Sequence, residues 1–421
     1  MKTEAFVTSA EVVNKNGARG VFTFTSDDGD PRTADFLFTR VAPNYPAFKI
    51  TIGIPTKKVA SLSLTEDGKA WQIDENGKYA LSILKNEYRS SIPGSVFSGD
   101  EFDTTVDFWR KIAECKAIEL ASHSHTHAAW GLTDEYNPPY PAGNVIKELH
   151  ASAQIVRELL GQDSPFILRP GGHSDLTSEY FYNLVGNDNT YIGMRGGSGP
   201  PPLPGAEIPL YAKLNTHVRF QEPIHRLRIT AIDVRGYEAA FGNNEKGYSN
   251  LAGDSSADCI AAGISAWKQY VDYALSFGGW ASVCFHSIVP DSTATAHGYA
   301  VFDSQFIALV EYLQPLADAG EIWLAPFASA AKYFIEWSSA EVRARVCDDG
   351  RIELTLTDNE TDPRFDEPLT VRITVPNDWT SARLDSYGKV TELKVQLASD
   401  GSRFVYADVI PGSEISRLSA C

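Results

Sequence analysis

Three histidines lie on alternate positions of one short segment, Ser122-His-Ser-His-Thr-His127, directly after an apolar, strand-like run at residues 117–121. The whole chain has only nine histidines. Histidine is the commonest side-chain metal ligand, and the four-residue spacing of His123 and His127 points two rings the same way on a helical turn or tight loop. The segment predicts part of a metal site, although a solvated polar loop could have the same composition.

A second segment with chemically useful side chains, Ser26-Asp-Asp-Gly29, follows another apolar run at residues 21–25. One carboxylate and two imidazoles would give three ligands and leave one side of a metal open, as hydrolytic chemistry requires. Asp27-Asp28-Gly29 alone is also a good turn sequence. The two segments together favour a metal-dependent hydrolase.

The composition excludes several classes of protein. A chain of 421 residues is long for one domain, and 43% hydrophobic residues are ample for a core. The net charge of −17 argues against nucleic acid and anionic membrane surfaces as partners, and it disfavours an acidic glycan. No apolar run approaches the roughly 20 residues of a membrane span. The oligomeric state stays open.

Five scattered cysteines, odd in number and without CxxC spacing, fit neither a disulfide framework nor a cysteine-rich zinc site. The first residues lack the apolar core of a signal peptide. We therefore expect either a cytoplasmic protein or a secreted or periplasmic one whose leader has been removed.

Short apolar runs alternate with helix-like segments between residues 19 and 337, which predicts an α/β fold. Seven or eight such units indicate a distorted (β/α) barrel, with a catalytic domain at residues 1–338. An irregular, Gly- and Pro-rich region at 195–226 would wall one side of its cleft. The expected helices span 144–160, 256–276 and 303–318, and the expected strands span 20–25, 47–54, 117–121, 165–169, 190–193, 227–233, 281–285 and 321–324.

After Trp337 apolar and polar residues alternate with period two, at 351–357, 369–375 and 404–410, with turn sequences between them. This pattern predicts a small all-β sandwich at residues 339–421. We interpret it as a structural cap rather than a carbohydrate-binding accessory. The acidic stretch 358–362 fits a solvated loop better than a calcium site.

Polar side chains follow four of the expected strands at the point where each strand ends. Residues just past the carboxyl ends of barrel strands converge on one face, where active sites are built. Singly, Arg169 could be a surface ion pair and His286 a buried core histidine. The residues in question are Asp27, Asp28, His123, His127, Arg169 and His286.

Four motifs, in this order and spacing, resemble those of the polysaccharide deacetylases, the NodB-homology group of carbohydrate esterase family 4. They are Thr25-Ser-Asp-Asp-Gly29, His123-Ser-His-Thr-His127, Arg169-Pro-Gly-Gly172 and Ser282-Val-Cys-Phe-His286. The resemblance covers most of residues 19–337. It implies a divalent metal ion, with Zn²⁺ favoured over Co²⁺, Mn²⁺ or Ni²⁺, bound by Asp28, His123 and His127.

The resemblance also implies catalytic roles. Asp27 would be the general base, Arg169 would pair with it and keep it ionised, and His286 would be the general acid. Both aspartates can reach one site only if the chain turns between them, which Gly29 would allow. Inside the histidine motif, we expect Ser124 to anchor the loop by hydrogen bonds and His125 to point elsewhere.

Some positions depart from the family pattern. Ser26 stands where the family has phenylalanine, and His173 follows Gly171 and Gly172 where an aromatic residue is common. The family's Asp-Trp motif has no clean match, and Asp233 is the nearest candidate for tuning His286. Substrate would lie against Pro170, Gly171, Gly172 and His173, with a backbone N–H stabilising the oxyanion.

The leading hypothesis is a metal-dependent hydrolase that removes N- or O-acetyl groups from an acetylated carbohydrate. A related C–N hydrolase of a small cyclic amide or imide would use the same apparatus. The third alternative is a catalytically inactive, carbohydrate-binding barrel.

Overall fold

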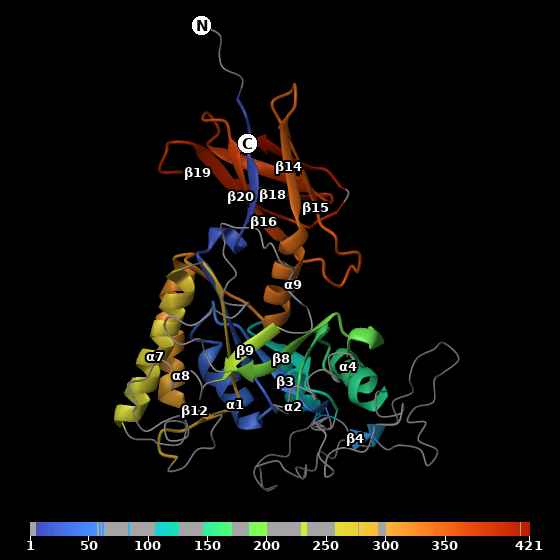
Figure 1. The fold of residues 1–421 in the computed structure, drawn as a ribbon, viewed down its shortest axis with the longest axis vertical. Helices are drawn as coiled ribbons and strands as arrows, with labels where there is room; N and C mark the ends of the chain where they lie inside the picture. The colour runs from blue at the N-terminus through green and yellow to red at the C-terminus, as the bar shows by residue number, and fades with distance from the viewer. Residues whose placement is uncertain are drawn as a thin grey trace, which may run out of the picture.

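The computed structural model describes residues 6–56, 59, 61–62, 83–84, 106–125, 146–170, 185–199, 229–233, 257–276, 278–293, 300–412 and 414–421. His127, Gly171, Gly172 and His173 lie outside these ranges. A parallel sheet with helices forms one end of the molecule and two antiparallel sheets form the other, with helix α9 between them (Figure 1).

The larger part is built on one parallel sheet with the strand order β10-β9-β8-β7-β6-β3-β2-β13. Strand β10 also pairs with β2, from Trp280 opposite Val21 to Phe285 opposite Ser26, so the sheet closes into a ring and β13 lies outside it. The strands are β2 (Gly20–Ser26), β3 (Ile50–Ile54), β6 (Ile118–Ser122), β7 (Phe166–Leu168), β8 (Gly193–Gly199), β9 (Ile229–Asp233), β10 (Trp280–Phe285) and β13 (Ile322–Leu324).

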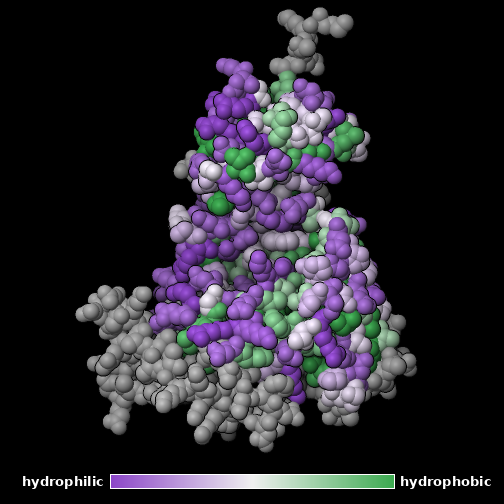
Figure 2. All heavy atoms as spheres, turned by 180° about the vertical axis from the view of Figure 1, so that it is seen from behind, coloured by the Kyte–Doolittle hydropathy of each residue, from purple (hydrophilic) through white to green (hydrophobic). Residues whose placement is uncertain are grey.

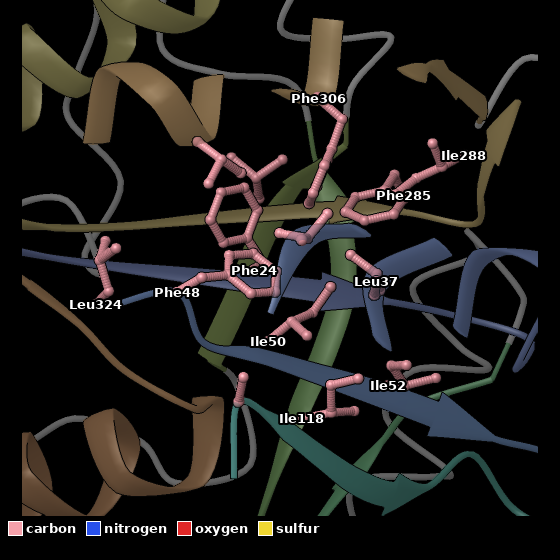
Figure 3. Packing of buried hydrophobic residues seen from close by; sticks show 14 of the residues in the cluster. Phe24, Leu37, Phe48, Ile50, Ile52, Ile118, Phe285, Ile288, Phe306 and Leu324 are labelled. Atoms are coloured by element: carbon pink, nitrogen blue, oxygen red, sulfur yellow. The ribbon is translucent and has the colours of Figure 1, made fainter. Parts of the chain in front are cut away.

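Helices pack on the outer face of this sheet, where the apolar side chains of the strands form a continuous core (Figure 3). Phe24 of β2 contacts both Phe48 and Phe306, with ring centroids 5.4 and 5.3 Å apart. The outer elements are α1 (Pro31–Phe36), η2 (Leu37–Val41), α2 (Val106–Ala113), the helical turns η4 (Ile146–Ala151), α4 (Ser152–Gln154) and η5 (Ile155–Leu159), α7 (Ala257–Ser276) and α8 (Asp303–Asp318).

The predicted α/β fold, a parallel sheet with flanking helices, is therefore confirmed. Each expected strand and helix is present with ends shifted by a few residues. One local expectation is wrong: residues 195–199, expected to be irregular, form the second half of β8. Short strands β11 (Ser287–Val289) and β12 (Ala300–Phe302) pair beside the main sheet.

Helix α9 (Phe327–Ser339) lies at the amino ends of the strands. Trp280, the first residue of β10, stacks on Phe334 with centroids 5.3 Å apart and tilts against Phe327 at 5.7 Å. The backbone N–H of Phe327 donates to Thr51, near the start of β3. Since the strands are parallel, α9 is at the opposite end of the sheet from their carboxyl ends.

The C-terminal part contains two antiparallel sheets, ordered β1-β16-β20-β19 and β14-β15-β21-β17-β18. Inward side chains of both sheets and of α9 belong to one hydrophobic cluster. Strand β1 comes from the start of the chain, so the first sheet joins segments more than 350 residues apart. The strands are β1 (Ala10–Val13), β14 (Glu341–Val346), β15 (Ile352–Thr357), β16 (Leu369–Val375), β17 (Ser381–Ser386), β18 (Lys389–Lys394), β19 (Gln396–Leu397), β20 (Arg403–Val409) and β21 (Ser416–Ala420).

The remaining described elements are η1 (Lys15–Gly17) and the two-residue strands β4 (Ser61–Leu62) and β5 (Ile83–Leu84). None of the described helices combines the length and the apolar character needed to cross a bilayer. Hydrophilic side chains predominate over scattered hydrophobic ones on the face seen in Figure 2.

Glu336 of α9 is a buried carboxyl group, 1% exposed, whose Oε2 accepts from the backbone N–H of Glu367 at 2.9 Å. Burial raises its pKa from 4.5 to about 9, and the nearby charge of Asp358 adds to the rise. The folded protein therefore holds a proton that the unfolded chain releases above about pH 4.5, so stability falls as the pH rises between these two values.

We expect Glu336→Gln to flatten this pH dependence. Between pH 5 and pH 8 the wild type should lose up to roughly 4 kcal/mol through this group, at about 1.4 kcal/mol per pH unit. Urea unfolding at both pH values measures the difference, with Glu392→Gln on the exposed strand β18 as control. If the free energy of unfolding changed equally with pH in wild type and Glu336→Gln, the Glu336 carboxyl group would have to be ionised in the folded protein.

Candidate active site

Five of the candidate residues lie at the carboxyl ends of four strands of the parallel sheet. Asp27 and Asp28 follow β2, His123 follows β6, Arg169 follows β7 and His286 follows β10. Asp27, His123 and Arg169 are buried, and Asp28 and His286 are about one quarter exposed at their side chains. Side chains that are distant in sequence thus meet at one edge of the sheet.

The chain turns sharply at Asp28. Asp27 still continues the β2–β10 pairing, because its backbone N–H donates to the carbonyl of Phe285 at 2.8 Å. Asp28 and Gly29 then both have positive φ, +68° and +55°. The turn begins one residue before the glycine expected to allow it. A left-handed conformation costs a non-glycine residue about 1 kcal/mol or more, and such residues cluster at functional sites.

Asp28 lies between two histidines. Its Oδ2 is 2.9 Å from His286 Nδ1, and its Oδ1 is 3.5 Å from His123 Nε2. His123 Nδ1 is 2.8 Å from the carbonyl oxygen of Leu168. Because a carbonyl only accepts, this bond places the proton on Nδ1 and directs the Nε2 lone pair of the neutral ring toward Asp28.

The distance between Asp28 and His123, two of the three residues expected to bind a metal ion, fits such an ion between them. A separation of 3.5 Å is long for a hydrogen bond, but two donors about 2.1 Å from a tetrahedral zinc are roughly 3.4 Å apart. The bond from His123 to Leu168 is the usual second contact of a metal-binding histidine. The third expected ligand, His127, lies outside the described residues, and within those residues no group of three or more His, Cys, Asp or Glu side chains could hold a metal.

The guanidinium group that contacts Asp27 belongs to Arg195 of β8. Its Nη2 donates to Asp27 Oδ1, its Nη1 donates to the carbonyl of Gly196 at 3.1 Å, and the residue is 1% exposed. Burial alone would raise the pKa of Asp27, but the positive charge of Arg195, with a smaller contribution from His286, holds that pKa below its usual range. Asp27 is therefore a carboxylate at neutral pH.

The sequence analysis missed Arg195 because it assigned this residue to an irregular region. A usable signal was present: Arg195 is the one charged residue in the run 190–199, which otherwise reads as strand followed by glycines. A lone charge on a strand inside a sheet must find a buried partner. Arg169, expected to hold Asp27, lies one strand away, and its backbone N–H donates to the carbonyl of Arg195 at 2.9 Å. Its role, like that of buried Pro170, stays a prediction.

Among the described side chains, the partner of His286 is Asp28, whereas the sequence had suggested Asp233. Burial lowers its pKa, but the hydrogen bond to Asp28 and the charges of Asp28 and Asp27 outweigh burial, so the pKa is raised. Asp233 ends β9 and lies opposite Cys284 of β10 in register. The direction of its side chain is not described, so the tuning role stays a prediction.

The two inner residues of the histidine motif have structural partners. His125 is buried, with Nδ1 2.9 Å from Thr56 Oγ1. Ser124 has φ +62°, its N–H donates to Ser122 Oγ, and its carbonyl accepts from Thr56 N–H. The backbone of this loop is therefore fixed on both sides.

No family model matches the chain. A gellan lyase from Bacillus sp is 23% identical over 357 residues, which are 81% of this chain and 13% of that protein. The chain thus spans about an eighth of the length of this relative.

Among solved structures, a Mycobacterium smegmatis protein assigned to the polysaccharide deacetylases matches 78% of this chain and 95% of its own, at 11% identity and a TM-score of 0.34. A peptidoglycan N-acetylglucosamine deacetylase matches 76% of this chain and 90% of its own, at 11% identity and a TM-score of 0.31. The BpsB deacetylase domain from Bordetella bronchiseptica matches 42% and 64%, at 18% identity and a TM-score of 0.26. Structures similar to this chain thus include polysaccharide and peptidoglycan deacetylases, but likenesses this low do not identify its reaction.

Proposed function

We propose that this chain is a metal-dependent hydrolase that releases acetate from an acetylated carbohydrate. The observation that supports it most is the arrangement around Asp27: a buried carboxylate paired with Arg195, next to Asp28, His123 and His286 at the carboxyl ends of the strands. This combines a base, metal-binding side chains and an acid within one small region.

Asp28, His123 and His127 would hold the metal ion, with Zn²⁺ first and Co²⁺, Mn²⁺ or Ni²⁺ as alternatives, since oxygen and nitrogen donors suit all four. Such an ion would act as a Lewis acid toward an acetyl carbonyl and make water more acidic.

Asp27 would act as the general base. Its pKa lies below the usual range, so the group is ionised at neutral pH but is a weak base. A weak base removes a proton efficiently only from water that has been acidified. The low pKa of Asp27 and the proposed metal requirement therefore support each other.

His286 would act as the general acid. Its raised pKa keeps a larger fraction of the ring protonated near neutral pH, as proton donation to the departing sugar nitrogen or oxygen requires. Asp233 would tune this histidine and Arg169 would assist at the base. Pro170, Gly171, Gly172 and His173 would contact the substrate.

For the C-terminal region, 339–421, we propose a β-sandwich accessory domain that stabilises the catalytic part, 1–338. Its two sheets share a cluster with α9, which covers the amino ends of the barrel strands, opposite the candidate site. A carbohydrate-binding surface there would be remote from the reacting groups. Strand β1 crosses this division, because it pairs with β16.

Acetate release tests the proposal. Purified protein is assayed on acetylated xylan and on N-acetylglucosamine oligomers as isolated, after chelation, and after Zn²⁺ or Co²⁺ is added back. We expect chelation to abolish release and metal to restore it, because neither Asp27 nor His286 can activate ordinary water alone. The preferred substrate would distinguish an amide from an ester.

Two other results would point away from the proposal. Metal binding without acetate release from either polymer would favour hydrolysis of a small cyclic amide or imide. Carbohydrate binding without metal or turnover would favour an inactive barrel.

A further inference from the structure

A chain of buried hydroxyl groups lies behind the loop that carries His123. Tyr191 Oη is 2.9 Å from Ser152 Oγ, and Ser152 Oγ is 2.8 Å from Ser122 Oγ. Ser122 Oγ in turn accepts the backbone N–H of Ser124 at 3.1 Å. All four residues are buried, so these bonds form out of contact with water.

This series of hydrogen bonds ends at Ser124, whose backbone is strained. Ser124 has φ +62°, a conformation that needs surrounding contacts to hold it. Its N–H is held by Ser122, and its carbonyl accepts from the N–H of Thr56 at 3.0 Å. The preceding residue, His123, donates its own N–H to the carbonyl of Ile54 at 2.9 Å. The left-handed turn at Ser124 thus sets where the backbone leaves His123.

One assignment of hydrogens gives every hydroxyl in the chain an acceptor. Ser152 donates to the carbonyl of Leu149 at 3.0 Å, which leaves its oxygen to accept from both Tyr191 and Ser122. Ser122 can then accept from Ser124 while it donates to Ser152. Such a fully satisfied network holds its members in one arrangement.

We propose that Tyr191, Ser152 and Ser122 are positioning residues that hold the Ser124 turn and thereby aim His123 at the metal. This rests on the proposed metal-dependent function. Contacts that fix the orientation of a metal-binding histidine without touching the metal typically contribute about 10- to 100-fold to metal affinity.

Tyr191→Phe is a clean probe, because the backbone around Tyr191 is held without the hydroxyl. Arg364 Nη1 donates to the carbonyls of Asn189 and Thr190 at 2.9 and 3.2 Å, and the N–H of Thr190 donates to Asp188. Removing the phenol oxygen therefore deletes one link of the chain and leaves the ring and the segment in place.

The experiment measures Zn²⁺ affinity by chelator competition and the visible spectrum of the Co²⁺-substituted protein. We expect Tyr191→Phe and Ser152→Ala each to weaken Zn²⁺ binding about 10-fold and to change the Co²⁺ bands. The matched control is Tyr333→Phe: this buried hydroxyl bonds the carbonyl of Val13 and the N–H of Thr370 at the other end of the molecule. It should lower stability and leave metal affinity and spectrum unchanged.

The outcomes separate the two proposals. Wild-type affinity and an unchanged Co²⁺ spectrum in both Tyr191→Phe and Ser152→Ala would overturn the positioning role alone. If Tyr333→Phe weakened metal binding equally, the effect would be general loss of stability and the positioning role would be wrong. A wild-type protein that binds neither ion would overturn the metal-dependent function itself, and this inference with it.

Discussion

Replacing Asp27 with asparagine should reduce acetate release by about 10²–10⁴-fold, the usual contribution of a general base. Asparagine keeps the shape of the side chain but cannot take up a proton. The metal should stay bound, because Asp27 is next to the proposed ligand Asp28 and is not itself a ligand. Turnover of acetylated oligosaccharide and metal content per chain are the two measurements.

The matched control is Asp30→Asn, in the same turn. Asp30 is the N-cap residue of α1, where its carboxylate accepts from Arg32 N–H and Thr33 Oγ1, and asparagine is an equally good N-cap residue. Its activity should stay within about 2-fold of wild type on these grounds. If Asp27→Asn retained full activity with metal bound, another group would have to be the base.

Replacing Arg195 with methionine should destabilise the fold by about 3–5 kcal/mol and abolish most activity. The reason is that Arg195 and Asp27 are 1% and 6% exposed, so loss of the guanidinium leaves a carboxylate buried without its partner. Urea unfolding measures the loss of stability. Arg169→Met is the matched comparison, since Arg169 is 5% exposed at the end of the adjacent strand.

A double-mutant cycle decides which arginine is coupled to the base. In an Asp27→Asn background there is no buried negative charge left to pair, so Arg195→Met should cost far less than it does in the wild type. The difference in the cost of Arg169→Met between the two backgrounds measures whether Arg169 is coupled to Asp27 as well. Strong coupling of Asp27 to Arg169 would support the role that the sequence motif implies for Arg169, and no coupling to Arg195 would contradict the pairing seen in the structure.

Local pattern was enough to predict the strands of the main sheet and three of the helical segments around it, but not α1 or α2. Buried parallel strands appear as short apolar runs, and the helices at 256–276 and 303–318 have a clear apolar face. Helix α9, which is buried on most sides, was not predicted. The pairing of β1 with β16 could not be predicted, because no local signal specifies a partner so far along the chain.

The sequence by itself determined five of the chemical groups that reach the site, although not Arg195. Asp27, Asp28, His123, Arg169 and His286 each follow an apolar strand, and parallel strands bring their carboxyl ends together whatever the details of packing. Only the tertiary structure decided which side chains contact one another at and behind the site. Arg195 donates to Asp27, and Tyr191 reaches Ser122 through Ser152, because such contacts depend on strand register and on which side chains face inward. Strand register and side-chain direction are set by packing across the whole sheet, not by neighbours in the sequence.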